Sequence, residues 1–263
     1  MTLLPVLSKV VAVDLVVVTV SALVLVGPER LRETAAELPD RLRDVAVPLV
    51  VLAVVLLVNS LIREPVTEVA WLVGVNVTPI IYGIEGDFVA WFQSLGTPAV
   101  TTLFSYAYVY GYVYVLVFPL VAYAALEDSR ALRELTVAYS VNYALGLVCY
   151  VLVVAYGPRN LLGETVESLL YTQHPEFQFL TSRVNSNTNV FPSLHTSLSA
   201  TVIGVAYDTR ETYPWWLAVA TVVGLSIIGA TMYLGIHWAT DVVAGLVLAA
   251  IAVTIGRRYA NRQ

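Results

Sequence analysis

Long apolar runs with few or no charges constrain this chain more than any other feature. Three of them, residues 45–62, 99–126 and 218–228, contain no charged side chain. A helix needs about 20 apolar residues to cross the hydrocarbon core of a bilayer, and such runs are typical of membrane spans. The whole chain is 58% hydrophobic and 13% charged, which leaves no stretch polar and long enough for a second, soluble domain. The sequence therefore predicts an integral membrane protein with a single domain over residues 1–263.

The fold class we expect is all-α, a polytopic helical bundle with about six to seven transmembrane helices. A strand exposed to lipid would leave backbone groups unpaired, so the spans are helices even where tyrosines alternate along residues 106–114. Residues 1–98 are expected to hold N-terminal spans and interfacial helices, and residues 99–256 the helical core with the candidate catalytic residues. The expected spans are residues 3–26, 45–62, 99–126, 135–156, 191–207, 215–234 and 237–255.

The connections between the spans are more polar. Residues 27–44 are expected to form a charged loop, and residues 161–189 a second long loop. Residues 63–96 are expected to form interfacial or re-entrant helices, because their aromatic rings favour the headgroup level. The single Cys149 excludes an intrachain disulfide and a cysteine metal cluster. The chain has no basic patch, so nucleic acid is not an expected partner.

Two short polar motifs stand out in this apolar chain, Phe191-Pro192-Ser193-Leu194-His195 and His237-Trp238-Ala239-Thr240-Asp241. His237 and Asp241 are four residues apart, a spacing that places both on one face of a helix. The carboxylate can then hold one imidazole nitrogen while the other faces a substrate. Ionisable groups inside membrane spans are costly and are usually functional, so His195, His237 and Asp241 are the candidate catalytic residues.

The first motif predicts an anion site at the start of a helix. Pro192 suits the first helical position, where a proline loses no hydrogen bond. The N–H groups of Ser193 and Leu194 would then point out of the helix start, as an anion site requires. A nucleophilic histidine, an orienting aspartate, a second histidine and an anion cradle together indicate phosphoryl transfer.

The motif Pro192-Ser193-Leu194-His195, followed by His237-x-x-x-Asp241, resembles the phosphatidic acid phosphatase type 2 superfamily. Leu194, where the superfamily usually has glycine, and residues 233–245 look most like its inositol phosphorylceramide synthase branch. The resemblance covers roughly residues 155–245. It implies a metal-independent phosphatase or phosphotransferase without a cofactor, surrounded by membrane lipids, whose substrate is a lipid phosphate or pyrophosphate. The branch implies an alternative, transfer of an inositol phosphate to a lipid acceptor.

The resemblance also implies a role for each matching residue. His237 would attack phosphorus and form a phosphohistidine, with Asp241 fixing its tautomer. His195 would protonate the leaving oxygen and later activate the acceptor. Ser193 and Arg159 would hold the nonbridging oxygens, Arg159 through the planar fork of N–H groups that suits phosphate.

Two positions depart from the superfamily's pattern, and both remove positive charge. The lysine of its first motif corresponds to Leu152, and the arginine six residues before the nucleophile corresponds to Thr231. A phosphoryl group in its transition state is stabilised largely by positioned cations. Arg183, nine residues before Pro192, is the other arginine expected near the chemistry. We expect Arg183 to fold over the site and complete the phosphate-binding set.

Two other classes of function stay open at this point. His195 and His237 could be the axial ligands of a haem in an electron carrier, although the aspartate and the proline-serine start have no role there. A catalytically inactive, lipid-binding scaffold predicts the same fold without turnover. Tyr106, Tyr110 and Tyr114 share one stripe of a helix, which either packs between helices or lines a slot for a lipid headgroup.

Basic residues are distributed unequally between the two ends of the expected bundle. Arg159, the helix start at Ser193 and the junction at His237 all fall at one end. The basic residues of that end are Lys9, Arg63, Arg159 and Arg183. The other end has Arg30, Arg32, Arg41, Arg43, Arg130, Arg133, Arg210, Arg257, Arg258 and Arg262. Because cytoplasmic loops carry the excess of lysine and arginine, we expect the candidate site to face out of the cytoplasm, in the cell membrane.

Cysteine labelling tests this orientation. In a Cys149→Ala background, the Thr188→Cys variant should react with a membrane-impermeant maleimide added to intact cells. The Thr209→Cys variant, at the opposite end, should react only after the cells are permeabilised. The reverse pattern would place the candidate site on the cytoplasmic side.

Overall fold

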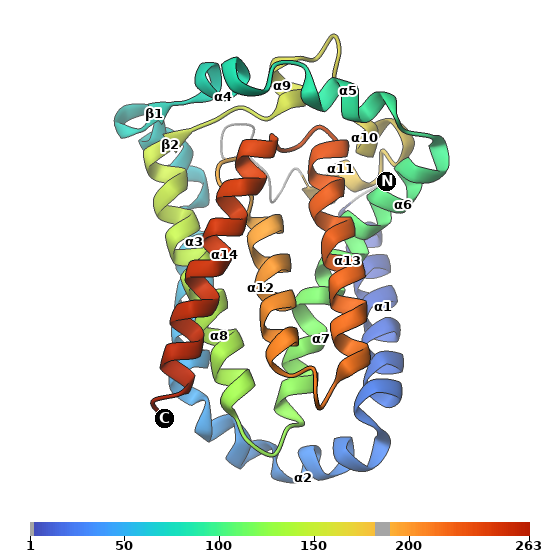
Figure 1. The fold of residues 1–263 in the computed structure, drawn as a ribbon, viewed down its shortest axis with the longest axis vertical. Helices are drawn as coiled ribbons and strands as arrows, with labels where there is room; N and C mark the ends of the chain where they lie inside the picture. The colour runs from blue at the N-terminus through green and yellow to red at the C-terminus, as the bar shows by residue number, and fades with distance from the viewer. Residues whose placement is uncertain (1–2, 182–189) are drawn as a thin grey trace.

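The computed structural model describes residues 3–181 and 190–263, and it is a bundle of upright helices with further helices lying across both ends (Figure 1). The long helices are α1 (Leu3–Ser21), α3 (Ala46–Val73), α7 (Tyr112–Ala124), α8 (Arg130–Leu152), α12 (Leu194–Asp208), α13 (Pro214–Tyr233) and α14 (Ala239–Ala260). The others are α2 (Pro28–Asp44), α4 (Thr78–Glu85), α5 (Phe88–Ser94), α6 (Pro98–Tyr106), α9 (Pro158–Leu161), α10 (Leu169–Gln173) and α11 (Phe177–Thr181). We call the end that carries α4, α5 and α9 the upper end, and the end that carries α2 the lower end.

Helix α12 is the centre of the bundle and packs against α7, α8, α13 and α14. Its side chains Leu198, Val202 and Val205 are completely buried. The peripheral helices α1 and α3 instead expose apolar side chains, among them Leu4 and Leu61, each more than 65% exposed. An outer surface of exposed leucine and valine is what a lipid environment requires, because lipid tails solvate such groups well.

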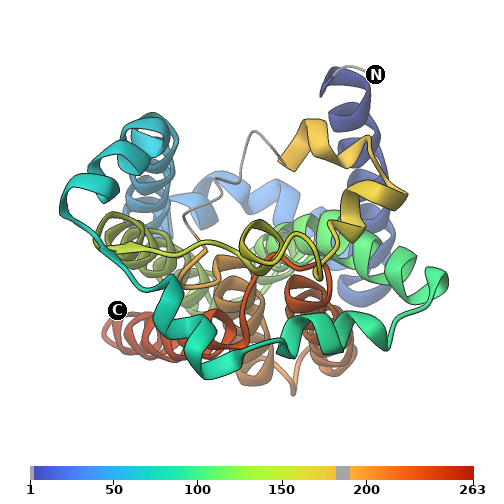
Figure 2. The ribbon, with the colours of Figure 1, turned by 90° about the horizontal axis from the view of Figure 1, so that it is seen from above.

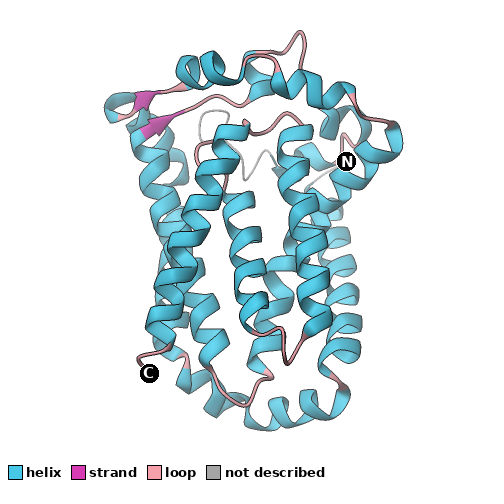
Figure 3. Cartoon of the chain, in the orientation of Figure 1, coloured by secondary structure: helices cyan, strands magenta, loops and turns pink. Residues whose placement is uncertain are grey.

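Five helical segments are long and apolar enough to cross a membrane: Leu3–Val26, Pro98–Ala124, Arg130–Leu152, Pro214–Tyr233 and Ala239–Ala260. A sixth is added if the bent pair Pro28–Asp44 and Ala46–Ile62 counts as one span. The expected all-α membrane bundle is therefore confirmed. In the described residues, β1 (Val75–Asn76) and β2 (Val153–Val154) form a single parallel pair of strands (Figure 3).

Three expectations about the elements need correction. The span expected at residues 191–207 is shorter, since α12 has 15 residues and begins only at Leu194. Residues 27–44 form helix α2 rather than a loop: Pro28 starts it, and Arg41 and Arg43 lie in its last turn, where the helix dipole favours positive charge. The stretch 161–189 includes the short helices α10 and α11, so it is not a plain loop.

A π-helical turn between α6 and α7, Ala107–Gly111, sets the direction of the tyrosines on this span. Such a turn changes the register of the side chains that follow it. Tyr106 and Tyr110 pack on Phe177 of α11, and Tyr114 packs on α13. The contacts that the described residues show for these three tyrosines are therefore packing between helices.

Buried polar side chains link the central helices through hydrogen bonds. Asn142 of α8 donates to Thr201 Oγ1 of α12 at 3.0 Å and accepts from the Ser197 hydroxyl. Near the lower end, Arg257 of α14 donates through Nε to Asp208 Oδ2 at 2.9 Å. A polar group in an apolar interior is costly unless it is paired. These bonds therefore fix how α8, α12 and α14 are placed against one another.

Helices α12 and α14 approach each other closely at Gly245. A Cβ atom at this position would lie 2.6 Å from the carbonyl oxygen of Ser193 and 3.0 Å from Thr196 Cβ. A glycine is therefore required for the two helices to meet at this distance, and the meeting point lies beside the start of α12.

The variant Gly245→Ala is expected to unfold at a lower temperature in detergent. The added methyl group forces α12 and α14 apart, and overpacking of this kind costs about 1–3 kcal/mol. Gly83→Ala is the matched control, because a Cβ atom at Gly83 meets nothing within 4 Å. Equal unfolding temperatures for Gly245→Ala and the parent would show that the close approach is not needed.

Candidate active site

Three segments that are far apart in the sequence meet at the upper end of the bundle. Arg159 lies on α9, His195 lies at the start of α12, and His237 lies in the turn between α13 and α14. All three line one cavity of about 480 Å³, which extends between α3, α8 and the tyrosine-bearing span. The alternation of the spans places these segments at the same end, as expected, and the tertiary structure brings their side chains to one cavity.

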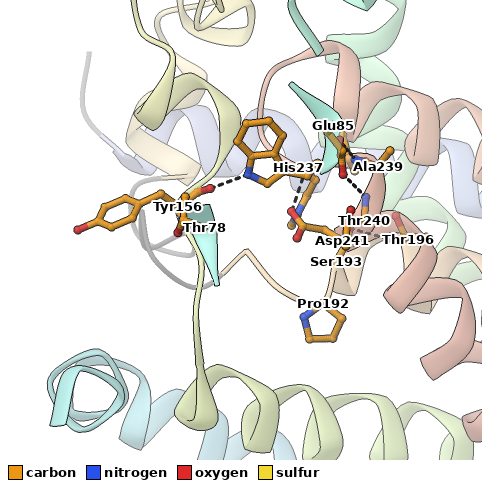
Figure 4. Close-up of polar contacts among 12 residues, drawn as sticks. Thr78, Glu85, Tyr156, Pro192, Ser193, Thr196, His237, Ala239, Thr240 and Asp241 are labelled. Carbon is orange, nitrogen blue, oxygen red and sulfur yellow. Dashed lines mark hydrogen bonds and ion pairs between the residues drawn. The ribbon is translucent and has the colours of Figure 1, made fainter. Parts of the chain in front are cut away.

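His237 and Asp241 form a buried pair in the site (Figure 4). His237 is 5% exposed, Asp241 is fully buried, and His237 Nδ1 lies 3.4 Å from Asp241 Oδ2. The same carboxylate oxygen accepts the N–H of Trp238 at 2.9 Å and so caps the start of α14. The expectation that the histidine and the aspartate share a helix face is wrong, because His237 precedes α14 and Asp241 folds back toward it. With Nδ1 beside the carboxylate, Nε2 is the ring nitrogen left to react.

The turn that carries His237 is held by hydrogen bonds to a single carbonyl group, that of Thr231. The N–H groups of Ile236 and His237 both donate to the Thr231 carbonyl oxygen, each at 3.0 Å. Gly235 permits this path because its φ is +69°, and its carbonyl oxygen accepts the Arg159 N–H at 3.0 Å. Position 231 is thus a buried threonine that supports the turn, and it brings no positive charge to the site.

His195 lies between two tyrosine rings. Its ring centroid is 4.5 Å from that of Tyr108 and 4.2 Å from that of Tyr112. It is 6.3 Å from the ring centroid of His237, and both imidazoles line the same cavity. No carboxylate of the described residues pairs with His195, so its orientation comes from the two tyrosines.

Ser193 is the N-cap of α12 rather than a residue inside the helix. Its Oγ accepts the N–H of Thr196 at 3.3 Å, and its own N–H donates to the carbonyl oxygen of Asp241 at 3.1 Å. The expectation that Pro192 begins the helix and leaves the Ser193 N–H free is therefore wrong. The amide of Ser193 joins α12 to α14 instead. The Ser193 side chain is fully buried and does not line the cavity, unlike Leu194 and His195.

Arg159 brings a partly unpaired guanidinium group to the cavity. Its Nη2 donates to the Tyr171 hydroxyl at 3.2 Å, and the guanidinium carbon lies 4.8 Å from the centre of that ring. Its Nη1 is buried and has no hydrogen-bond partner within residues 3–181 and 190–263. Buried donors without a partner are rare, so Nη1 is available to an anionic ligand. Leu152, in contrast, is 52% exposed and does not line the cavity.

Arg183 lies outside the described residues, so its contact with the site stays a prediction. The third histidine, His174, packs on Tyr106 and Phe177 and does not line the cavity. In the described part of the chain, no group of three or more histidine, cysteine, aspartate or glutamate side chains is arranged to hold a metal ion.

Three residues of the site were missed from the sequence: Glu85, Tyr108 and Tyr112. The Glu85 carboxylate accepts the N–H groups of Ala239, at 2.8 Å, and of Thr240 (Figure 4). No local pattern relates Glu85 to a helix that starts about 150 residues later. The two tyrosines belong to the alternating run, but the π-helical turn that directs them to His195 leaves no signal in the residue pattern.

These features define a membrane-embedded helical bundle with two histidines, an aspartate and an arginine around a cavity at one end. The family model of the PAP2 superfamily (phosphatidic acid phosphatase type 2) matches residues 83–255, about two thirds of the chain. The chain belongs to this superfamily, and the expected core in the C-terminal part is confirmed. Membership indicates phosphatase-type activity on lipid phosphates. No curated protein and no solved structure matches the chain.

Replacing Arg159 tests whether its unpaired Nη1 serves the phosphoryl group. Arg159→Ala should lower turnover of a lipid phosphate by about 10²–10³-fold, as loss of one transition-state donor typically does. Arg159→Lys should recover only part of the lost turnover, because an ammonium group lacks the planar fork of N–H groups. Arg210→Ala, at the exposed lower end, is the control and should keep the parental rate. A parental rate for Arg159→Ala would assign this residue to packing on Tyr171 alone.

Proposed function

We propose that this protein is a lipid phosphatase or phosphotransferase that acts on a lipid phosphate or pyrophosphate through a phosphohistidine at His237. The observation that carries the proposal is the buried His237–Asp241 pair, which opens onto the same cavity as His195 and Arg159. A carboxylate-oriented imidazole, a second imidazole across a gap and an unpaired arginine are the groups that phosphoryl transfer through histidine needs.

The proposed reaction has two halves. First, His237 Nε2 attacks phosphorus and the bond from phosphorus to the lipid oxygen breaks, while His195 gives its proton to that oxygen. Then His195 takes a proton from water or from an alcohol, whose oxygen attacks phosphorus and releases His237. Asp241 holds the Nδ1 proton in both halves and stabilises the charge that forms on the imidazole.

The phosphoryl oxygens are proposed to bind between Arg159 and the start of α12. Arg159 offers Nη1, and Ser193 offers its hydroxyl proton. The first N–H groups of a helix lack partners within that helix, so Leu194 and His195 add two donors at the positive end of the helix dipole. We propose that Arg183 joins this set and supplies charge in place of the superfamily's absent lysine and arginine.

The lipid part of the substrate is proposed to occupy the rest of the cavity. Its lining is largely apolar, with Leu56, Val113 and Leu147 from three different helices. The aromatic rings of Tyr143 and Tyr150 contribute further surface of mixed character. A cavity that joins a polar end to an apolar interior suits a molecule with a phosphate head and a hydrocarbon chain.

Transfer to a lipid alcohol, as in the inositol phosphorylceramide synthase branch, is the second candidate. It is favoured by Leu194, which lines the cavity next to His195 and packs where a Cβ at Gly146 would lie 2.7 Å away. A bulky apolar side chain at this place favours a lipid acceptor over water in the second half of the reaction. The site is proposed to face out of the cytoplasm, since the expected excess of arginines lies at the lower end.

A turnover experiment with trapping of the intermediate tests the phosphohistidine. Purified protein in detergent and chelator is given phosphatidate, a polyprenyl pyrophosphate or an inositol phospholipid with a lipid alcohol, and released phosphate and new lipid are followed together. The variant His237→Ala should lose about 10⁴-fold or more in turnover, as removal of a nucleophile does, and should form no acid-labile phosphoenzyme. Asp241→Asn should lose less.

His174→Ala is the matched control for this experiment. It removes a histidine from the same end of the molecule that does not line the cavity, so turnover and phosphoenzyme should stay at parental levels. Turnover that survives in His237→Ala would exclude the phosphohistidine mechanism.

A further inference from the structure

A strap of two short helices, residues 78–94, crosses the upper end of the bundle and passes over α14 and then α13 (Figure 2). Its first helix follows the strand pair of β1 with β2, and Thr78 Oγ1 accepts the N–H of Tyr156 at 3.0 Å. Its second helix leads directly into α6. Gly86 separates the two helices and has a φ of +53°, which lets the chain turn between them.

Glu85 is the last residue of α4, and its side chain contacts the start of α14. Its two carboxylate oxygens accept the N–H groups of Ala239 and Thr240, and the carboxylate of Asp241 accepts the N–H of Trp238. These N–H groups have no partner inside the helix. A carboxylate is favoured at this end by the helix dipole and by charge-assisted hydrogen bonds. Glu85 therefore fixes where α14 begins, two residues after His237.

Gln93, in α5, holds the other side of the same turn. Its Nε2 donates to the Tyr233 carbonyl oxygen at 2.9 Å and to the Glu167 carbonyl oxygen at 3.0 Å. Its Oε1 accepts the N–H of Glu167 at 3.0 Å. Tyr233 is the last residue of α13, so the amide of Gln93 fixes where the turn starts.

We propose that the strap positions the nucleophile: Glu85 and Gln93 hold the two ends of the turn 234–238, and so set the place of the His237 imidazole. Neither side chain lines the cavity, so both act through the turn rather than on the substrate. This inference rests on the proposed function, because it assigns the strap to the reaction of His237. Other bonds also hold this turn: the Arg159 N–H donates to the Gly235 carbonyl oxygen at 3.0 Å, and Trp238 Nε1 donates to the Tyr156 carbonyl oxygen at 2.7 Å. Glu85 and Gln93 are the side chains of the strap that hold the helix ends on either side of it.

The kinetic signature of positioning is a lower kcat with little change in KM. A shift of about 1 Å in a reacting group can cost about 10²-fold in rate, so Glu85→Ala is expected to lower kcat by about 10- to 100-fold. Glu85→Gln should recover much of this loss, because its amide oxygen still accepts an N–H of α14. Gln93→Ala should give a loss of the same kind. The matched control is Asp87→Ala, an exposed carboxylate of the strap with no side-chain cap bond, which should keep the parental kcat.

A second variant removes the contact from the other side. Ala239→Pro deletes one N–H that Glu85 accepts, while proline at the first helical position preserves the helix start. It should lower kcat, and the double variant Glu85→Ala/Ala239→Pro should be no slower than Glu85→Ala alone, since coupled residues are not additive. Additive losses, or a parental kcat for Glu85→Ala, would overturn the proposal.

A measurement without substrate separates this inference from the proposed function. Diethyl pyrocarbonate modifies accessible imidazoles, and mass spectrometry reports the rate at each histidine. His237 is 5% exposed, so Glu85→Ala should raise its modification rate several-fold while His174 stays unchanged. An unchanged His237 rate overturns the inference. A raised rate in a protein whose parent turns over none of the lipids would overturn the proposed function and leave the strap's role in placing His237.

Discussion

The junction where α12 and α14 begin is the contact on which the rest of the site depends. One hydrogen bond, from the Ser193 N–H to the Asp241 carbonyl oxygen, crosses it, and Gly245 lets the two backbones approach closely enough to form it. Each helix carries one of the two site histidines at or just before its start. The separation of His195 and His237 is therefore set by backbone packing, which is stiffer than any pair of side chains.

Charge is used sparingly in this apolar bundle. Of the described residues that line the cavity, Arg159 is the one with a permanent positive charge. In a medium of low polarity an unpaired ion is expensive. The ring and hydroxyl of Tyr171 stabilise the Arg159 guanidinium in part, while Arg159 Nη1 has no hydrogen-bond partner among the described residues. At the opposite end, Arg257 is neutralised by Asp208, so its charge serves the packing of α12 and α14.

The carboxylates of Asp241 and Glu85 together accept the first N–H groups of α14. Asp241 accepts the Trp238 N–H and faces the imidazole, while Glu85 takes the next two N–H groups from outside the bundle. A helix start that is satisfied in this way does not compete for the substrate's anion. The start of α12 is capped through Ser193 Oγ, which accepts the N–H of Thr196.

The sequence by itself determined the all-α membrane bundle, because a span of apolar residues has few structures open to it in lipid. It also determined that Arg159, His195 and His237 lie at one end, since each span reverses the direction of the chain. The exact helix starts, and with them the contacts of His237 and Ser193, were predicted less well. The spacing of His237 and Asp241 suggested a shared helix, and Pro192 suggested a helix start, but both depend on where a helix begins, which local pattern places only within a few residues.

The tertiary structure alone decided the partners of these residues. The contact of Glu85 with α14 joins positions 154 residues apart, so no periodicity or motif contains it. The rings around His195 depend on a π-helical turn, Ala107–Gly111, which the alternating pattern of tyrosines does not predict. The Ser193 N–H donates to the Asp241 carbonyl oxygen because α12 and α14 approach closely at Gly245. In each case the contact is decided by packing between helices. Such packing joins residues that are far apart in the sequence and that meet only in the folded chain.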